Sequence, residues 1–193
     1  DGIRDTSVTG VQTCALPIYD PHAPKFSDTW KTLSAIPGFK RLLTVVGLGT
    51  AAFNMQDILL EPFGGQVFGL PVGETTMLMA ALAGGMLIGF FIAERLLNRS
   101  LIAMRVAGLG LVIGLLAFAG VIAAPYFSSL SLFRIASLTV GIGAGLFSVG
   151  TLTATMGCGT PKMSGILLGS WGAVQATVAG LSIAFSGAAR DII

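Results

Sequence analysis

Five long apolar stretches, each long enough to cross a lipid bilayer as a helix, constrain this sequence more than any other feature. They cover residues 42–60, 76–93, 101–124, 132–156 and 163–186. A hydrocarbon core about 30 Å thick is crossed by about 20 residues of α-helix. Within lipid these stretches must be helices, because open strands would leave backbone N–H and C=O groups unpaired. The sequence therefore predicts an all-α, polytopic membrane bundle with five transmembrane helices.

The charge content supports a membrane environment. Only 10% of the 193 residues are charged and 53% are hydrophobic, whereas a soluble domain carries about 25% charged residues. So few charges cannot cover a surface that faces water, and membrane lipid is the expected surrounding. The formal net charge of +2 is too small to indicate a nucleic-acid partner.

The basic residues indicate which way the first helix enters the membrane. With five crossings, eight Lys and Arg residues fall on one side and two on the other. The eight are Lys25, Lys31, Lys40, Arg41, Arg95, Arg99, Arg105 and Lys162, and the two are Arg134 and Arg190. Because Lys and Arg gather in cytoplasmic loops, we expect the first transmembrane helix to start in the cytoplasm.

The segment before the first membrane helix divides into two parts. Residues 1–18 lack the basic start and unbroken apolar stretch of a signal peptide. Residues 8–18, VTGVQTCALPI, resemble a codon-by-codon translation of a sequencing-adapter oligonucleotide, so we expect residues 1–18 not to be native. Their exclusion leaves Cys158 as the one native cysteine and predicts a chain truncated at its start. Residues 19–41 are predicted to form a cytoplasmic linker with an amphipathic helix.

Glycines recur four residues apart within the apolar stretches. The pairs are Gly85/Gly89, Gly110/Gly114, Gly141/Gly145 and Gly165/Gly169. Small residues at this spacing let the backbones of membrane helices approach closely. We therefore expect these four pairs to lie at helix–helix contacts.

The first membrane helix carries an unusual row of polar residues. Thr50, Asn54, Asp57 and Glu61 are spaced so that they share one helical face, while Gln56 is expected to point elsewhere. One interpretation is a polar stripe that lines a cavity and holds a proton, a cation or the central metal of a pigment. The other is polar contact between helices together with a solvated helix end, and Pro62 favours that reading for Glu61.

Two further sets of residues are candidates for a functional role. Trp171 and Gln175 are neighbours on the last helix and are suited to stacking on a ring system and hydrogen bonding to it; ordinary helix packing is the alternative. Glu94, Arg95 and Arg99 follow Gly85 and Gly89. They resemble the G-x-x-x-[DE]-R-x-x-x-R signature in a short cytoplasmic loop of major facilitator superfamily proteins, where it is linked to helix packing and switching. Simple cytoplasmic anchoring is the alternative for this loop.

Catalytic chemistry has no visible support in the sequence. We find no nucleophile–base pair, no metal-ligand cluster and no phosphate-binding loop. His22 is the one histidine and lies in the predicted linker, so no histidine is available within the helices to bind a pigment metal. We therefore expect a protein that is not an enzyme and has no catalytic or metal-binding residues of its own.

Two stretches resemble a known family. The sequence FNMQDILLEPFGGQVFGL at residues 53–70 and the sequence LLGSWGAVQATVAG at residues 167–180 are similar to the PucC/LhaA family, the bacteriochlorophyll-delivery branch of the major facilitator superfamily. The resemblance covers residues 20–193. It implies a twelve-helix protein in which residues 42–193 hold helices seven to eleven and residues 19–41 end the central cytoplasmic linker.

The resemblance also implies a function. Family members are associated with assembling photosynthetic light-harvesting antenna complexes in the intracytoplasmic membrane of phototrophic bacteria. The implied cargo is bacteriochlorophyll, and the implied partners are antenna polypeptides and the pigment or its synthase. Candidate pigment- or partner-binding residues are then Thr50, Asn54, Asp57, Glu61, Trp171 and Gln175. The alternatives are a proton-coupled secondary transporter of a small molecule, with Asp57 as coupling site, and a structural scaffold without pigment contact.

Overall fold

The computed structural model describes residues 26–160 and 163–192. It divides into one unit of residues 1–36 and a second unit of residues 37–193, which we describe separately. The predicted non-native segment, residues 1–18, lies outside the described residues. In the first unit, helix α2 spans Phe26–Ala35, within the predicted linker. Trp30 is exposed on this helix and Leu33 is buried.

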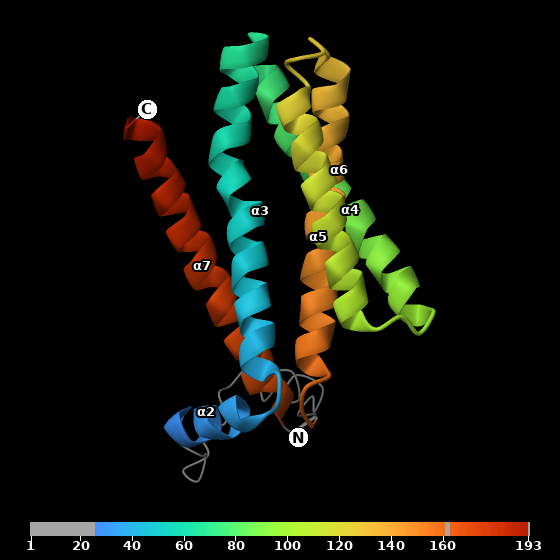
Figure 1. Cartoon of the computed structure of the whole chain (residues 1–193), viewed down its shortest axis with the longest axis vertical. Coiled ribbons are helices and arrows are strands. Elements are labelled where there is room, and N and C mark those ends of the chain that lie inside the picture. The colour runs from blue at the N-terminus through green and yellow to red at the C-terminus, as the bar shows by residue number, and fades with distance from the viewer. Residues whose placement is uncertain (1–25, 161–162, 193) are drawn as a thin grey trace, which may run out of the picture. The chain divides into compact units, whose positions relative to one another are not determined.

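The second unit contains five helices that are long and apolar enough to span a membrane, which confirms the predicted fold class. They are α3 (Phe39–Phe68), α4 (Val72–Asn98), α5 (Ala103–Ala123), α6 (Leu130–Met156) and α7 (Ser164–Ile192). Successive helices run in alternating directions (Figure 1), as short connections between full crossings require. The chain is thus a multi-pass membrane protein segment.

Helix α3 is longer than the sequence predicts. We expected it to end near Glu61 and a long connection to follow, but it continues through Pro62 to Phe68. Membrane helices tolerate proline because neighbouring groups can satisfy the freed backbone carbonyl. The end comes at Gly69, whose φ of 63° and N–H bond to the Gly64 carbonyl form a left-handed C-terminal cap. Only three residues then separate α3 from α4.

Helix α6 packs against both α4 and α5, and glycines make this packing possible. A Cβ atom on Gly85 would collide with the Leu138 carbonyl oxygen of α6, and one on Gly141 would collide with the Leu82 carbonyl oxygen of α4. On the other side, a Cβ on Gly110 would lie 2.6 Å from the Gly143 carbonyl oxygen. Cβ atoms on Gly89 and Gly145 would also meet the facing backbone, and one on Gly114 would meet the ring of Phe53 on α3. Three of the four predicted glycine pairs therefore lie at close contacts.

The fourth pair departs from the prediction. Cβ atoms on Gly165 or Gly169 would meet nothing within 4 Å. Both glycines belong to α7, which packs mainly against α3 and only slightly against α6. The four-residue spacing therefore predicts close packing only where a second helix is available to fill the groove.

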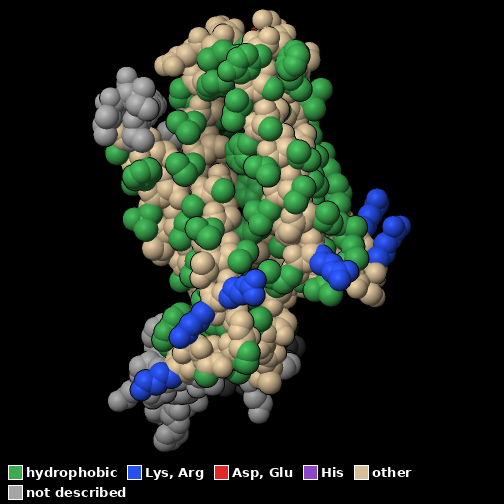
Figure 2. Space-filling model, viewed as in Figure 1, with side chains coloured by type: hydrophobic (Ala, Val, Ile, Leu, Met, Phe, Trp, Pro, Cys, Tyr) green, Lys and Arg blue, Asp and Glu red, His purple; other side chains and the backbone are tan. Residues whose placement is uncertain are grey.

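The surface of α3–α7 suits a bilayer. Figure 2 shows apolar side chains spread over the visible face, with Lys and Arg towards one end. Large apolar side chains such as Leu48, Leu115 and Phe185 are more than 60% exposed. Outside a membrane such exposure would be costly, whereas lipid accepts it.

Candidate functional site

A cavity of about 410 Å³ lies among α3, α4, α6 and α7 and brings together residues far apart in the sequence. It is lined by Thr50, Phe53, Asn54, Met86, Ala144, Phe147, Ser148, Gly172, Gln175, Ala176 and Ala179. Four of these side chains carry hydrogen-bonding groups and none of them is ionisable. We call this space the interior cavity.

Thr50 and Asn54 form the α3 wall of the interior cavity. Thr50 is 5% exposed, and its hydroxyl oxygen has no hydrogen-bond partner among the described residues. The Asn54 amide donates to the Thr50 backbone carbonyl at 2.8 Å, which fixes the amide along the helix. A buried polar group without a partner costs free energy, so the Thr50 hydroxyl is suited to meeting a ligand.

Gln175 lines the interior cavity from α7, but its neighbour Trp171 does not. The Trp171 indole N–H lies 3.3 Å from the Thr151 hydroxyl of α6, and the Thr151 hydroxyl in turn lies 2.8 Å from the Phe147 carbonyl oxygen. Trp171 therefore links α7 to α6, and the structure separates two residues that the sequence paired.

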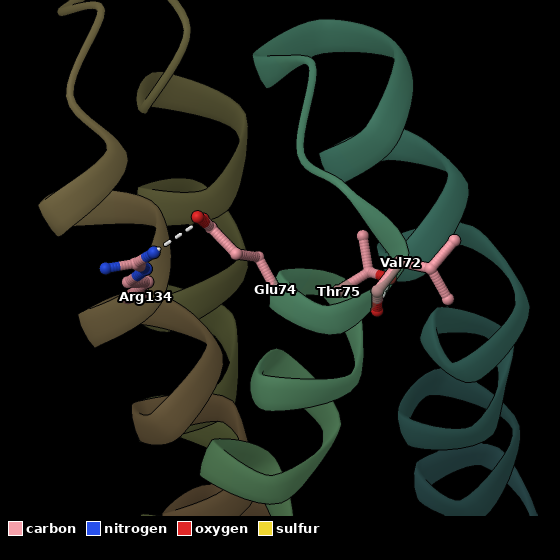
Figure 3. A network of polar contacts seen from close by, with 4 residues as sticks. All are labelled: Val72, Glu74, Thr75 and Arg134. Carbon is pink, nitrogen blue, oxygen red and sulfur yellow. Dashed lines mark hydrogen bonds and ion pairs between the residues drawn. The ribbon is translucent and has the colours of Figure 1, made fainter.

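Glu61 is also apart from the interior cavity. It is exposed, and its carboxylate lies 3.3 Å from the Thr75 hydroxyl at the start of α4. The same hydroxyl donates a hydrogen bond to the Val72 carbonyl (Figure 3). Glu74, the neighbour of Thr75 on α4, forms an ion pair with Arg134 of α6 at 2.8 Å. These contacts join α3, α4 and α6 at one end of the helical bundle. The side chain of Asp57 lies outside the described residues.

The structure adds two residues that the sequence did not single out. Ser148 of α6 lines the interior cavity, although as one of several hydroxyl residues on α6 it has no distinguishing spacing. Gln56 was expected merely to point away from the stripe. It is 7% exposed, and its side-chain oxygen lacks a hydrogen-bond partner among the described residues. The signal in the sequence that could have identified Gln56 is a polar amide within the apolar stretch of residues 42–60.

The motif that the sequence assigns to a loop lies mostly within α4, which ends at Asn98, and only Arg99 follows the helix. Gly85 and Gly89 pack against α6, whereas Glu94, Arg95 and Arg99 are exposed. Gly89 precedes Glu94 by five residues, one more than the signature has. The match therefore depends on the charged residues, while the glycines serve packing.

The described side chains of the interior cavity are suited to binding a ligand. Its hydroxyl and amide groups can donate and accept hydrogen bonds, and its aromatic wall includes Phe53 and Phe147, whose ring centroids are 5.7 Å apart. Such an uncharged, partly aromatic site suits a neutral ligand with a few polar groups.

The chain was compared with known proteins. The family model described as PUCC protein matches residues 18–193. Protein PucC of Rhodovulum sulfidophilum is 48% identical over 174 residues, which are 90% of this chain and 38% of that protein. Protein PucC of Cereibacter sphaeroides is 45% identical over 170 residues, 88% of this chain and 37% of that protein. No solved structure matches.

A more distant relative has a different name. The bacteriochlorophyll synthase 44.5 kDa chain of Rhodobacter capsulatus is 28% identical over an alignment of 193 positions. That alignment covers 92% of this chain and 42% of that protein. The chain thus spans roughly two-fifths of the length of the relatives it matches. Since the family model matches nearly every residue, the chain belongs to the PUCC protein family.

Proposed function

We propose that this chain is part of an assembly factor for photosynthetic light-harvesting antenna complexes and that its interior cavity binds a polar group of the cargo. The cargo is bacteriochlorophyll or an antenna polypeptide. Family membership supports the assembly role, and the name of the Rhodobacter capsulatus relative, a bacteriochlorophyll synthase chain, connects the family to bacteriochlorophyll. The proposed location is the photosynthetic intracytoplasmic membrane, with the start of α3 in the cytoplasm.

The interior cavity is the observation that carries this proposal. It brings a buried, unpartnered hydroxyl at Thr50 and the amides of Asn54 and Gln175 into the lining of one cavity between apolar helices. Unsatisfied polar groups at such depth are costly and commonly mark a functional site. A neutral pigment or a polar side chain of an antenna helix would supply the missing hydrogen bonds.

The described lining of the interior cavity consists of uncharged side chains, while the side chain of Asp57, the candidate coupling residue, lies outside the described residues. A transporter that couples to protons needs a side chain that titrates within its site. None of the described residues that line the interior cavity titrates. We propose a binding factor rather than an enzyme, because the described lining offers hydrogen-bonding and aromatic groups.

The test replaces cavity amides in living cells. The gene, taken at its full genomic extent, is expressed in a phototrophic bacterium that lacks its own counterpart. We expect Asn54→Leu and Gln175→Leu to lower the near-infrared absorption of the antenna complexes several-fold at normal protein level. Thr177→Leu is the matched control, because Thr177 is exposed on α7, two residues from Gln175.

Two results would count against the proposal. Antenna absorption unaffected by removal of the whole gene would exclude the assembly role. Full absorption in both cavity variants would exclude the interior cavity as the binding site.

A further inference from the structure

A second cavity, of about 430 Å³, lies between α3 and α5 and shares no lining residue with the interior cavity. Apolar side chains dominate its lining, including Phe63 of α3 and Phe118 and Ile122 of α5. We call it the Gln56 groove. Asn54 and Gln56 are about 200° apart around α3, since each helical residue turns by about 100°. The two cavities therefore lie on opposite faces of one helix.

Gln56 is the unusual member of this groove. Its side chain lines the groove and is 93% buried, with an oxygen that has no hydrogen-bond partner among the described residues. The α5 residues of the groove are Phe118, Val121 and Ile122, whose side chains have no donor. Gln66 of α3 also lines the groove and carries an amide donor, but it lies ten residues, about 15 Å, further along the helix. We therefore expect the partner to be a ligand, because buried polar groups in native proteins are nearly always satisfied.

The groove restricts what that partner can be. Its lining residues, among those that the structure describes, are uncharged, so a ligand with net charge would lose its hydration without compensation. A flat, apolar molecule can stack on the rings of Phe63 and Phe118. It must also offer the carboxamide oxygen either a hydrogen-bond donor or a metal ion. A magnesium tetrapyrrole fits these conditions, because its macrocycle is neutral overall and magnesium, a hard cation, takes oxygen ligands.

We propose that the Gln56 groove binds the macrocycle of a magnesium tetrapyrrole and that the Gln56 carboxamide oxygen is the axial ligand of the magnesium. This inference rests on the proposed function for the presence of pigment, and it assigns the pigment to a different cavity from the interior one. The terminal torsion of glutamine is broad, so the amide can turn its oxygen towards the metal. The interior cavity then remains free for an antenna polypeptide.

The experiment measures bound pigment directly. The gene at its full genomic extent is expressed in a phototrophic host, and the protein is purified in mild detergent. Extraction gives the ratio of pigment to protein. We expect Gln56→Leu to lower this ratio at least about tenfold, as loss of a metal contact does. Thr44→Leu, an exposed polar-to-leucine change on the same helix that lines neither cavity, should keep the wild-type ratio.

A second variant tests the ligand itself. Gln56→His replaces the oxygen with an imidazole nitrogen that can also bind magnesium. We expect it to keep the pigment but to move the visible absorption band that responds to axial ligation. This band decides the question even if Gln56→Leu fails to fold: an unmoved band in the histidine variant overturns the proposal.

The remaining outcomes separate this inference from the proposed function. Wild-type pigment content in a folded Gln56→Leu variant overturns the Gln56 groove as the site. Pigment lost from Asn54→Leu but kept in Gln56→Leu assigns it to the interior cavity instead. Wild-type protein that carries no pigment, in cells whose antenna assembly still requires the gene, overturns this inference and leaves the assembly role intact.

Discussion

Asn54 and Gln56 give α3 hydrogen-bonding groups on opposite faces at nearly the same depth. Asn54 is near the middle of the thirty-residue helix, and Gln56 is one half-turn further along. Each lines its own cavity. A helix that only anchored the chain would have apolar residues at both positions, because burying an amide in hydrocarbon is costly. We therefore expect α3 to be central to the proposed binding function.

At Asp57, the two competing functions predict different results for one conservative change. Asp57→Asn removes the titrating group but keeps a side-chain oxygen, whereas Asp57→Leu removes both. Under the assembly proposal we expect Asp57→Asn to preserve most antenna absorption in cells and Asp57→Leu to reduce it. Complete and equal loss in both variants, with protein levels unchanged, would instead favour proton-coupled transport.

The sequence predicted part of the binding site, and the reason is geometric. The four-residue spacing places Thr50 and Asn54 on one face, and the structure has both in the interior cavity. The same spacing could not predict that Glu61 would reach the start of α4 or that Trp171 would bond to Thr151. Those positions depend on which helix lies alongside, and periodicity within a single helix contains no such information.

At the scale of the helix, two adjacent glycines on α4 offer a matched test of packing. A Cβ on Gly85 would collide with the backbone of α6, while a Cβ on Gly84 would meet nothing within 4 Å. Both changes to alanine raise helix propensity by about 1 kcal/mol. We expect Gly85→Ala to be destabilising overall, because overpacking costs about 1–3 kcal/mol, and Gly84→Ala to be neutral or stabilising.

Thermal unfolding of the purified protein in detergent would measure this difference. Equal melting temperatures for the two alanine variants would show that the α4–α6 contact is looser than described.

The existence of the helices could be predicted from the length of the apolar stretches, but the end of α3 could not. Pro62 looked like a stop signal, and only the backbone cap at Gly69 shows where the helix ends.

For the whole molecule, the basic residues predict an orientation that labelling can check. Lys40 lies in the first turn of α3, and Glu74 lies in the first turn of α4, at the opposite end of the bundle. Lys162 lies outside the described residues but between α6 and α7. In a background without Cys14 and Cys158, an impermeant maleimide should label Glu74→Cys on intact cells. It should label Lys40→Cys and Lys162→Cys only after lysis, and labelling of Lys162→Cys on intact cells would reverse the orientation.

The pairing of α3 with α7 has a consequence for biosynthesis. The ribosome makes α3 first among the five helices, yet the helix it packs against most extensively emerges last. At about 5–20 residues per second, α7 is completed on the order of ten seconds after α3. During that interval the Thr50 and Asn54 face has no α7 to cover it, while α4, α5 and α6 can already close on one another. The α7-facing side of α3 is therefore completed only when the last of the five helices has been made.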